Sequence, residues 1–178
     1  MKVTLREHLK TIDQNGQVCE AQIDSLVKRM KKKFKDCGFV KASKRDDLIR
    51  RYIDMIFETQ DYRCTHWIPV NKDELNGVWN RPFAGYVGWK TKEVLYEIDH
   101  VHPVNAGGRD SLRNFQFLSA NANQFVKCSL TYRDLYRRVD LSDSLKSRIS
   151  DVMTRRSQLF ASSKWKDFMS DVEEAETQ

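Results

Sequence analysis

The sequence predicts an α+β fold in which helices flank a central segment of short strands and turns. Apolar residues recur with the period of an amphipathic helix over residues 17–36 and again over 43–60. From residue 61 onward, aromatic and β-branched residues, prolines and glycines become frequent, which is typical of short strands and turns. We therefore divide the chain into three parts: a basic helical arm (1–60), a mixed core (61–130) and a helical C-terminal segment (131–178).

The two N-terminal helices have candidate boundaries in the sequence. The first should stop before Gly38, because glycine is common just past the C-terminus of a helix. Either Ser43 or Asp46 is expected to cap the second. At the other end of the chain, we expect the acidic tail 171–178 to be frayed.

The middle of the chain predicts a strand, a loop, a second strand and a helix. Residues 92–101 alternate in polarity as a half-buried strand does, and a loop with two adjacent glycines follows. A short apolar run then predicts a second strand, and a short helix comes after it. The expected elements are a strand at 92–101, a loop at 103–113, a strand at 115–118 and a helix at 120–127.

Composition and charge restrict the class of protein. Of the 178 residues 40% are hydrophobic and 31% charged, a balance typical of a globular protein. The net charge of +6 permits nucleic acid, an anionic membrane surface or an acidic protein as a partner. Between residues 28 and 51 there are eleven Lys or Arg and three Asp, more positive charge than a helix dipole needs.

No apolar run is long enough to cross a membrane, and residues 1–7 lack the apolar core of a secretory signal, so we expect a cytoplasmic protein. The four cysteines, at positions 19, 37, 64 and 128, form no C-x-x-C pair. In a reducing compartment we interpret them as free thiols, and their spacing argues against a four-cysteine zinc site.

The pair Asp99-His100 joins a carboxylate to an imidazole at the end of the predicted first strand. Hydrolysis of a phosphodiester needs a base near neutral pH and a hard cation that stabilises the developing negative charge. Histidine has a suitable pKa for the base, and carboxylate and amide oxygens suit the cation. Neighbouring strand residues point to opposite faces, but we expect the turn at the strand end to let both serve one site.

A larger ordered set surrounds this pair: Asp99-His100-Val101-His102-Pro103, then Gly107-Gly108, then Asn114 and, nine residues later, Asn123. The set resembles the HNH endonucleases, also called ββα-metal nucleases. The resemblance covers residues 61–130 and is specific over 96–127. It implies a ββα-metal core between the N-terminal and C-terminal helices, with Mg²⁺ or Mn²⁺ as the cofactor and DNA as the substrate.

The resemblance also implies a role for each matching residue. His100 matches the general base that activates water, and Asp99 matches the first metal ligand. Asn123 matches the second ligand; Asn121 competes for this role, but the nine-residue spacing favours Asn123. Asn114 matches the central asparagine, which holds the loop and does not touch the metal.

Several basic residues and one further histidine are candidates for contacts with nucleic acid. Lys127 falls where a basic residue often follows the motif, Arg109 lies in the glycine loop, and His102 lies near the base. The alternatives are a solvated loop position for Arg109 and simple lining of the loop for His102. The N-terminal candidates, which otherwise form a solvated helix face, are Lys31, Lys32, Lys33, Arg45, Arg50 and Arg51.

The chain departs from many relatives of this family, which brace the motif with two C-x-x-C pairs around a structural zinc. Cys64 stands where the first pair would begin, but Trp67 lies three residues later, and the second pair would fall at Ser119 and Ala122. We expect no structural zinc. The tryptophans expected to brace the motif instead are Trp67, Trp79 and Trp89.

The preferred interpretation is a metal-dependent HNH endonuclease that hydrolyses DNA. A single site per chain cuts one strand, so the protein either nicks DNA or dimerises to cut both strands. One rival is a non-catalytic DNA-binding protein with a nuclease-like core. Another is a ribonuclease or toxin of the same fold.

Overall fold

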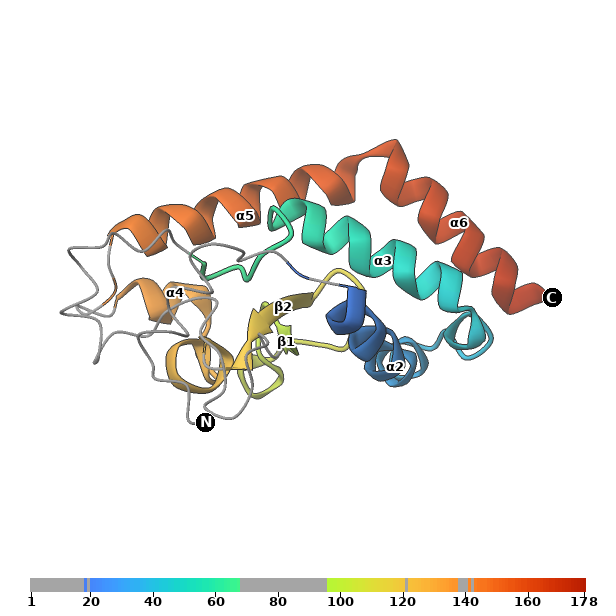
Figure 1. The fold of residues 1–178 in the computed structure, drawn as a ribbon, viewed down its shortest axis with the longest axis horizontal. Coiled ribbons are helices and arrows are strands. Elements are labelled where there is room, and N and C mark those ends of the chain that lie inside the picture. Colours follow the sequence, from blue (N-terminus) through green and yellow to red (C-terminus); the bar gives the residue numbers. More distant parts are fainter. Residues whose placement is uncertain (1–17, 19, 68–95, 121, 138–140, 142) are drawn as a thin grey trace.

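Helices make up most of the fold, and a two-stranded antiparallel sheet lies among them (Figure 1). The structure is a computed structural model that describes residue 18 and residues 20–67, 96–120, 122–137, 141 and 143–178. The expectations for Trp79, Trp89, Asn121 and Cys19 lie outside the described residues, as does the part of the predicted first strand before residue 96.

The first N-terminal helix, α2, spans Glu20–Asp36 and stops where the sequence predicted. Gly38 adopts a left-handed φ of +92°, and its N–H donates to the carbonyl of Lys35 at 2.9 Å. Glycine adopts this conformation without the steric cost of a Cβ atom. The helix buries Leu26, Val27, Met30 and Phe34 on one face.

The second helix, α3, spans Asp46–Thr59 and follows a short 3-10 turn, η1, at Ala42–Lys44. The predicted caps are wrong: Arg45 occupies the N-cap position and its side chain makes no capping bond. The Ser43 hydroxyl instead donates to the carbonyl of Val40 at 2.6 Å, inside the preceding turn. Asp46 and Asp47 lie in the first turn, where their negative charge favours the helix N-terminus.

Both predicted strands that flank the glycine loop form. Strand β1 spans Tyr96–His100 and β2 spans Phe115–Ser119. They pair antiparallel, with Asp99 opposite Gln116 and His100 opposite Phe115. The register therefore places one polar pair and one pair of rings side by side at the loop end of the hairpin.

The chain after β2 turns back along β1. Element η4, at Ala122–Lys127, is a π-helix that stands where the sequence predicted a helix. The Ser119 hydroxyl accepts the N–H of Ala122 at 3.2 Å and starts this turn. The short helix α4, at Tyr132–Tyr136, follows and is capped by the Thr131 hydroxyl.

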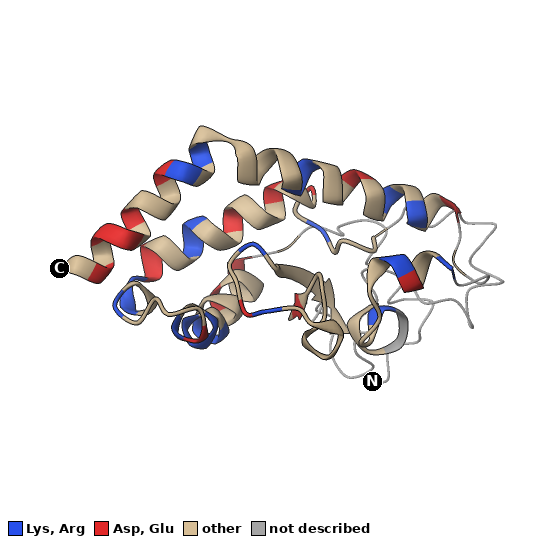
Figure 2. Ribbon diagram, turned by 180° about the vertical axis from the view of Figure 1, so that it is seen from behind, with Lys and Arg blue, Asp and Glu red and all other residues tan. Residues whose placement is uncertain are grey.

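Two long helices complete the fold: α5 at Asp143–Ala161 and α6 at Ser163–Thr177. The expectation of a frayed tail is wrong, because α6 continues to Thr177. Glu176 accepts the backbone N–H of Ala42 at 2.7 Å, and Asp171 pairs with Arg51. Figure 2 shows the reason: the acidic end of α6 lies beside the basic N-terminal elements.

One apolar core joins all three segments that the sequence distinguished. Phe34, Tyr52, Phe117 and Trp165 are at most 1% exposed and belong to the same cluster. The rings of Phe57 and Phe117 stack at 4.7 Å between centroids, which presses β2 against α3. This core holds the hairpin against α2 and α3. In the part of the chain that the structure describes, no helix has the length and apolar character needed to span a membrane.

Candidate active site

The face of β1 that is turned toward η4 carries two carboxylates. Glu97 and Asp99 are two residues apart in the strand and therefore point to the same side. Glu97 accepts hydrogen bonds from Asn123 Nδ2 at 2.6 Å and from Gln124 Nε2 at 2.9 Å. Glu97 thus ties η4 to β1 and leaves the Asn123 amide oxygen as the atom available for a ligand.

Asp99 is largely buried, with 11% of its side chain exposed. Its Oδ2 accepts a hydrogen bond from Gln116 Nε2 at 2.8 Å, and Lys127 Nζ lies 3.7 Å from the same oxygen. Burial raises the pKa of Asp99 above its usual value, while Lys127 and Gln116 pull the pKa down. Burial likewise lowers the pKa of Lys127, and Asp99 opposes that shift.

A chain of hydrogen bonds behind Asp99 sets the orientation of Gln116. The Tyr132 hydroxyl donates to Gln116 Oε1 at 2.8 Å, and His66 Nε2 lies 3.1 Å from the Tyr132 oxygen. Because Tyr132 donates to Oε1, the amide nitrogen of Gln116 faces the Asp99 carboxylate. Burial lowers the pKa of His66 to about 3, so this imidazole is neutral and donates from Nε2.

Lys127 lies inside the protein. Its side chain is 0% exposed, its Nζ donates to the carbonyl of His100 at 3.2 Å, and it lies over the ring of Tyr132. The predicted phosphate contact does not fit this position, because the ammonium does not reach the surface. Lys127 instead joins η4 to the end of β1 through one hydrogen bond and one ion pair.

His100 points away from Asp99, as alternation in a regular strand requires. Its Nε2 lies 2.9 Å from Asp110 Oδ1, and its ring packs 5.0 Å from that of Phe115. Lys33 of α2 lies 3.3 Å from the same Asp110 oxygen. The structure therefore places the two predicted catalytic side chains on opposite sides of the strand end, because β1 stays regular through His100.

Asn114 closes the loop between the strands. Its Oδ1 accepts the N–H of His102 at 2.8 Å, and its Nδ2 donates to the carbonyls of His102 and Arg109, each at 2.9 Å. Val101 N–H donates to the Asn114 carbonyl at 2.8 Å. Three side-chain bonds from one amide hold both ends of the loop.

The two loop glycines have different roles. Gly107 has a φ of +93°, and a Cβ added there would meet nothing within 4 Å. Gly108 lies so close to His102 that a Cβ would stand 1.9 Å from its carbonyl oxygen. Glycine at 108 is thus needed for the close approach of two backbone segments, whereas glycine at 107 is favoured by conformation.

His102 faces a second part of the surface. Its Nε2 bonds to the carbonyl of Ala106 at 2.8 Å, which agrees with the alternative in which it lines the loop. It also borders a cavity of about 580 Å³ between the loop and α4. Arg133 and Arg137 lie on the opposite wall of that cavity.

Five of the six N-terminal cations expected to contact nucleic acid form ion pairs with carboxylates. Lys31 pairs with Asp46, and Lys33 with Asp110. The three arginines are also paired: Arg45 with Asp47, Arg50 with Asp24 and Glu20, and Arg51 with Asp171. Only Lys32 of the six has no carboxylate partner among the described residues.

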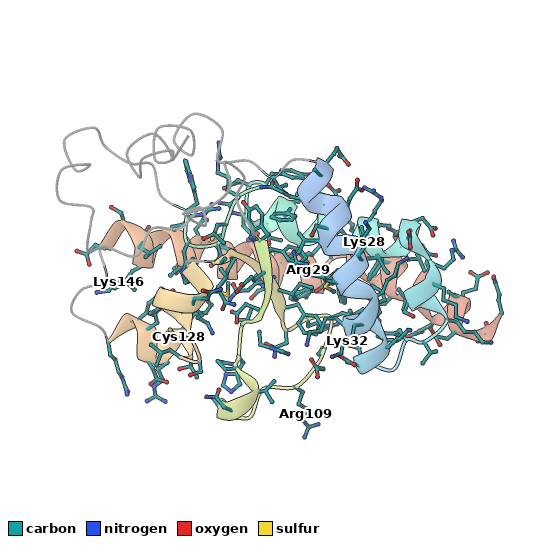
Figure 3. The ribbon with its side chains drawn as sticks, turned by 60° about the horizontal axis from the view of Figure 1, so that its bottom comes forward. Lys28, Arg29, Lys32, Arg109, Cys128 and Lys146 are labelled. Atoms are coloured by element: carbon teal, nitrogen blue, oxygen red, sulfur yellow. The ribbon has the colours of Figure 1, made fainter. Side chains whose placement is uncertain are left out.

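A different set of cations is unpaired on α2. Lys28, Lys32 and Lys35 are exposed, have no carboxylate partner in the described part of the chain and recur at helical spacing. Figure 3 shows Lys28 and Lys32 along α2, and Arg109 pointing away from the loop into open space. The lysines of α2 that the sequence predicts to contact nucleic acid include both paired and unpaired ones, and the sequence could not separate the two kinds.

Of the four positions at which a resemblance to HNH nucleases would place zinc ligands, only Cys64 is a cysteine, and hydrogen bonds connect these positions. Cys64 Sγ accepts the N–H of Ser119 at 3.2 Å, and the Ser119 hydroxyl accepts the N–H of Ala122. Trp67 N–H donates to the Cys64 carbonyl at 2.9 Å, and Arg63 lies over the indole. Hydrogen bonds therefore link the same points that a zinc ion would link.

No family model, curated protein or solved structure matches the chain. The resemblance to HNH nucleases thus depends on the motif and on the positions of its residues. Among the described residues, no group of three or more His, Cys, Asp or Glu side chains is arranged to hold a metal ion. A cation at this site would depend on Asp99 and an amide oxygen.

Several residues that contact the predicted ones were not predicted from the sequence. Gln116 holds Asp99, Glu97 holds Asn123, and Asp110 holds His100. Strand alternation was a usable signal for Glu97, which is two residues before Asp99. No local signal pointed to Asp110, because its partner is ten residues away across a folded loop.

Proposed function

We propose that this protein is a metal-dependent endonuclease that hydrolyses DNA phosphodiester bonds at the end of β1. The observation that carries the proposal is the buried Asp99 carboxylate, which Gln116 orients on the strand face where Glu97 holds Asn123. The partly exposed imidazole of His100 is next in sequence, at the end of the same strand. Buried carboxylates are costly unless they are paired or bind a cation. A phosphodiester that lies across the strand end contacts Asp99 from one side and His100 from the other.

The donor atoms fit a hard divalent cation. Asp99 offers a carboxylate, and Asn123 offers its amide oxygen because its nitrogen is bound to Glu97. Mg²⁺ is commonly held by one or two protein oxygens together with waters and substrate phosphate. When bound, Mg²⁺ or Mn²⁺ would stabilise the negative charge that develops on the phosphate and the leaving oxygen.

The chain's own residues supply the proton transfer and the positioning of the loop. His100 takes a proton from the attacking water, and Asn114 keeps the loop in position while this occurs. The loop bonds of Asn114 matter because a misplaced base loses much of its rate advantage. One such site cuts one strand, so the product is a nick unless two copies act together.

The unpaired lysines of α2 supply an anion-binding surface next to the site. Lys28 and Lys32 are free to meet phosphates, whereas Lys31 and Lys33 are already neutralised by Asp46 and Asp110. Such contacts contribute affinity that does not depend on base sequence. Arg109 adds an exposed cation on the loop, next in sequence to Asp110, which contacts His100.

One observation favours a second function, binding of DNA without cleavage. The buried ammonium of Lys127 already lies beside Asp99 and partly neutralises it, which competes with a metal ion for the carboxylate. In that case the basic surface of α2 would still bind nucleic acid. The two functions differ in a single respect, which is metal-dependent cutting.

The decisive experiment incubates supercoiled plasmid with purified protein in Mg²⁺, in Mn²⁺ or in EDTA. We expect metal-dependent conversion to nicked circles by the wild type and loss of at least about 100-fold in rate for His100→Ala and Asp99→Ala. A matched single-stranded RNA in parallel tests the ribonuclease alternative. Binding in a gel shift without any cutting in either metal would overturn the nuclease proposal and leave the binding function.

A further inference from the structure

His100 has a carboxylate partner that does not belong to the motif. Asp110 Oδ1 lies 2.9 Å from His100 Nε2, and both side chains lie at the protein surface, 37% and 18% exposed. Asp110 is the residue after Arg109 in the glycine loop. The contact thus joins the end of β1 to the far side of the loop that follows it.

The position of Asp110 is itself determined from two sides. Lys33 of α2 lies 3.3 Å from the same oxygen of Asp110, and Asn114 binds the carbonyl of the preceding residue, Arg109. The bond with His100 and the ion pair with Lys33 lower the pKa of Asp110, so it is ionised near neutral pH. An ionised carboxylate only accepts hydrogen bonds, so Nε2 of a neutral His100 must carry the proton.

From this geometry we propose that Asp110 is the positioning carboxylate of His100, which holds the imidazole in the tautomer whose Nδ1 accepts the proton of the attacking water. The inference rests on the proposed nuclease function and adds to it a residue and a nitrogen atom. It uses the arrangement common to many catalytic histidines, in which a second group orients the base.

The water oxygen bonds to phosphorus, its proton moves to His100 Nδ1, and the bond from phosphorus to the 3′ oxygen breaks. The 3′ oxygen takes a proton from solvent, and the imidazolium then returns its proton to solvent. Asp110 keeps its negative charge throughout and stabilises the transient imidazolium through Nε2–H.

The first test measures cleavage kinetics of Asp110→Asn and Asp110→Glu. Asparagine keeps the size of the side chain but can also donate, so the wrong tautomer becomes accessible. We expect the turnover rate to fall about 10- to 100-fold for Asp110→Asn, the order seen when a second-layer partner is lost. The half-saturating DNA concentration should stay equal or fall, because a negative charge near DNA is removed. Asp110→Glu should recover part of the rate.

The matched control is Asp167→Asn, which removes the same charge from an exposed position on α6, outside the hairpin. This variant should leave both the turnover rate and the half-saturating DNA concentration unchanged. A rise in half-saturating DNA concentration with normal turnover in Asp110→Asn would show that Asp110 only supports the fold of a binding surface. That result would overturn the proposal.

The second test does not depend on cleavage. Long-range ¹H–¹⁵N NMR of the full chain reports which imidazole nitrogen carries the proton, and His100→Gln identifies the His100 signals among the four histidines. We expect Nε2–H in the wild type and a mixture of tautomers in Asp110→Ala. An Nδ1–H wild type, or an unchanged tautomer in Asp110→Ala, would overturn the proposal. If the tautomer is as expected but the wild type does not cut DNA, the proposed nuclease function is wrong, whereas the pairing of Asp110 with His100 is still supported.

Discussion

Gln116 Nε2 donates to Asp99 Oδ2 at 2.8 Å, directly across the two paired strands of the hairpin. Strand β2 carries none of the predicted metal ligands, but its residue Gln116 orients the predicted ligand Asp99 on β1. Tyr132 and His66 extend the connection into the interior. The orientation of the proposed metal ligand is therefore set by a row of side chains from three other segments: β2, α4 and the turn that contains His66.

We first predict that breaking this row weakens metal binding. Gln116→Leu and Tyr132→Phe should each raise the half-saturating Mn²⁺ concentration, measured by electron paramagnetic resonance, by about 10-fold. Tyr136→Phe is the matched control, because it removes a hydroxyl from the same short helix but not from the row. Equal Mn²⁺ binding by all three variants would show that Gln116 does not orient a metal ligand.

The unpaired lysines of α2 should dominate non-specific DNA affinity. Lys28→Ala/Lys32→Ala should reduce the slope of log K against log salt by about two, because each phosphate contact contributes about 0.9. Lys31→Ala should change the slope little, since its ammonium pairs with Asp46 at 2.7 Å. The double variant Lys146→Ala/Lys166→Ala lowers the net charge equally on α5 and α6 and controls for overall charge. Equal effects of the two double variants would contradict a defined surface on α2.

The two loop glycines should respond differently to alanine. Gly108→Ala places a methyl group 1.9 Å from the His102 carbonyl oxygen, so the loop must move and cleavage should be lost. Gly107→Ala meets no atom within 4 Å and should cost only about 1 kcal/mol of stability from its positive φ. Thermal unfolding and plasmid nicking, measured on both variants, separate the two effects. Similar nicking by both would mean that the close approach of His102 and Gly108 is not required.

His66 should make the fold sensitive to mild acid. Burial lowers its pKa to about 3 from 6.5, so between these values the unfolded chain binds a proton that the folded chain does not. The contribution of His66 to the free energy of unfolding is therefore fully present above pH 6.5. Below that pH it is lost by about 1.4 kcal/mol per pH unit. Urea unfolding at pH 7 and pH 5 should differ by about 2 kcal/mol more in the wild type than in His66→Gln. The same difference in both proteins would rule out His66 as the source.

Local patterns in the sequence were sufficient for the elements that form over short distances. Gly38 correctly predicted the end of the first helix. The alternation of polarity around Asp99 and the apolar run that begins at Phe115 predicted both strands of the hairpin. These features follow from backbone conformation and one-sided burial, which neighbouring residues determine. The predictions for the α3 cap and for the end of α6 were wrong. The Ser43 hydroxyl bonds to the carbonyl of Val40, three residues earlier, and the end of α6 is held by a bond between Glu176 and Ala42, which are far apart in sequence.

The sequence by itself determined which residues are candidates for chemistry, since Asp99, His100, Asn114 and Asn123 follow one another in a recognisable order. Only the tertiary structure decided how they are held. It placed Gln116 against Asp99, turned His100 toward Asp110 and buried Lys127. It also neutralised most of the cations predicted to bind DNA. The physical reason is that hydrogen bonds and ion pairs depend on distances between side chains, which strand register and helix packing set and which sequence spacing does not.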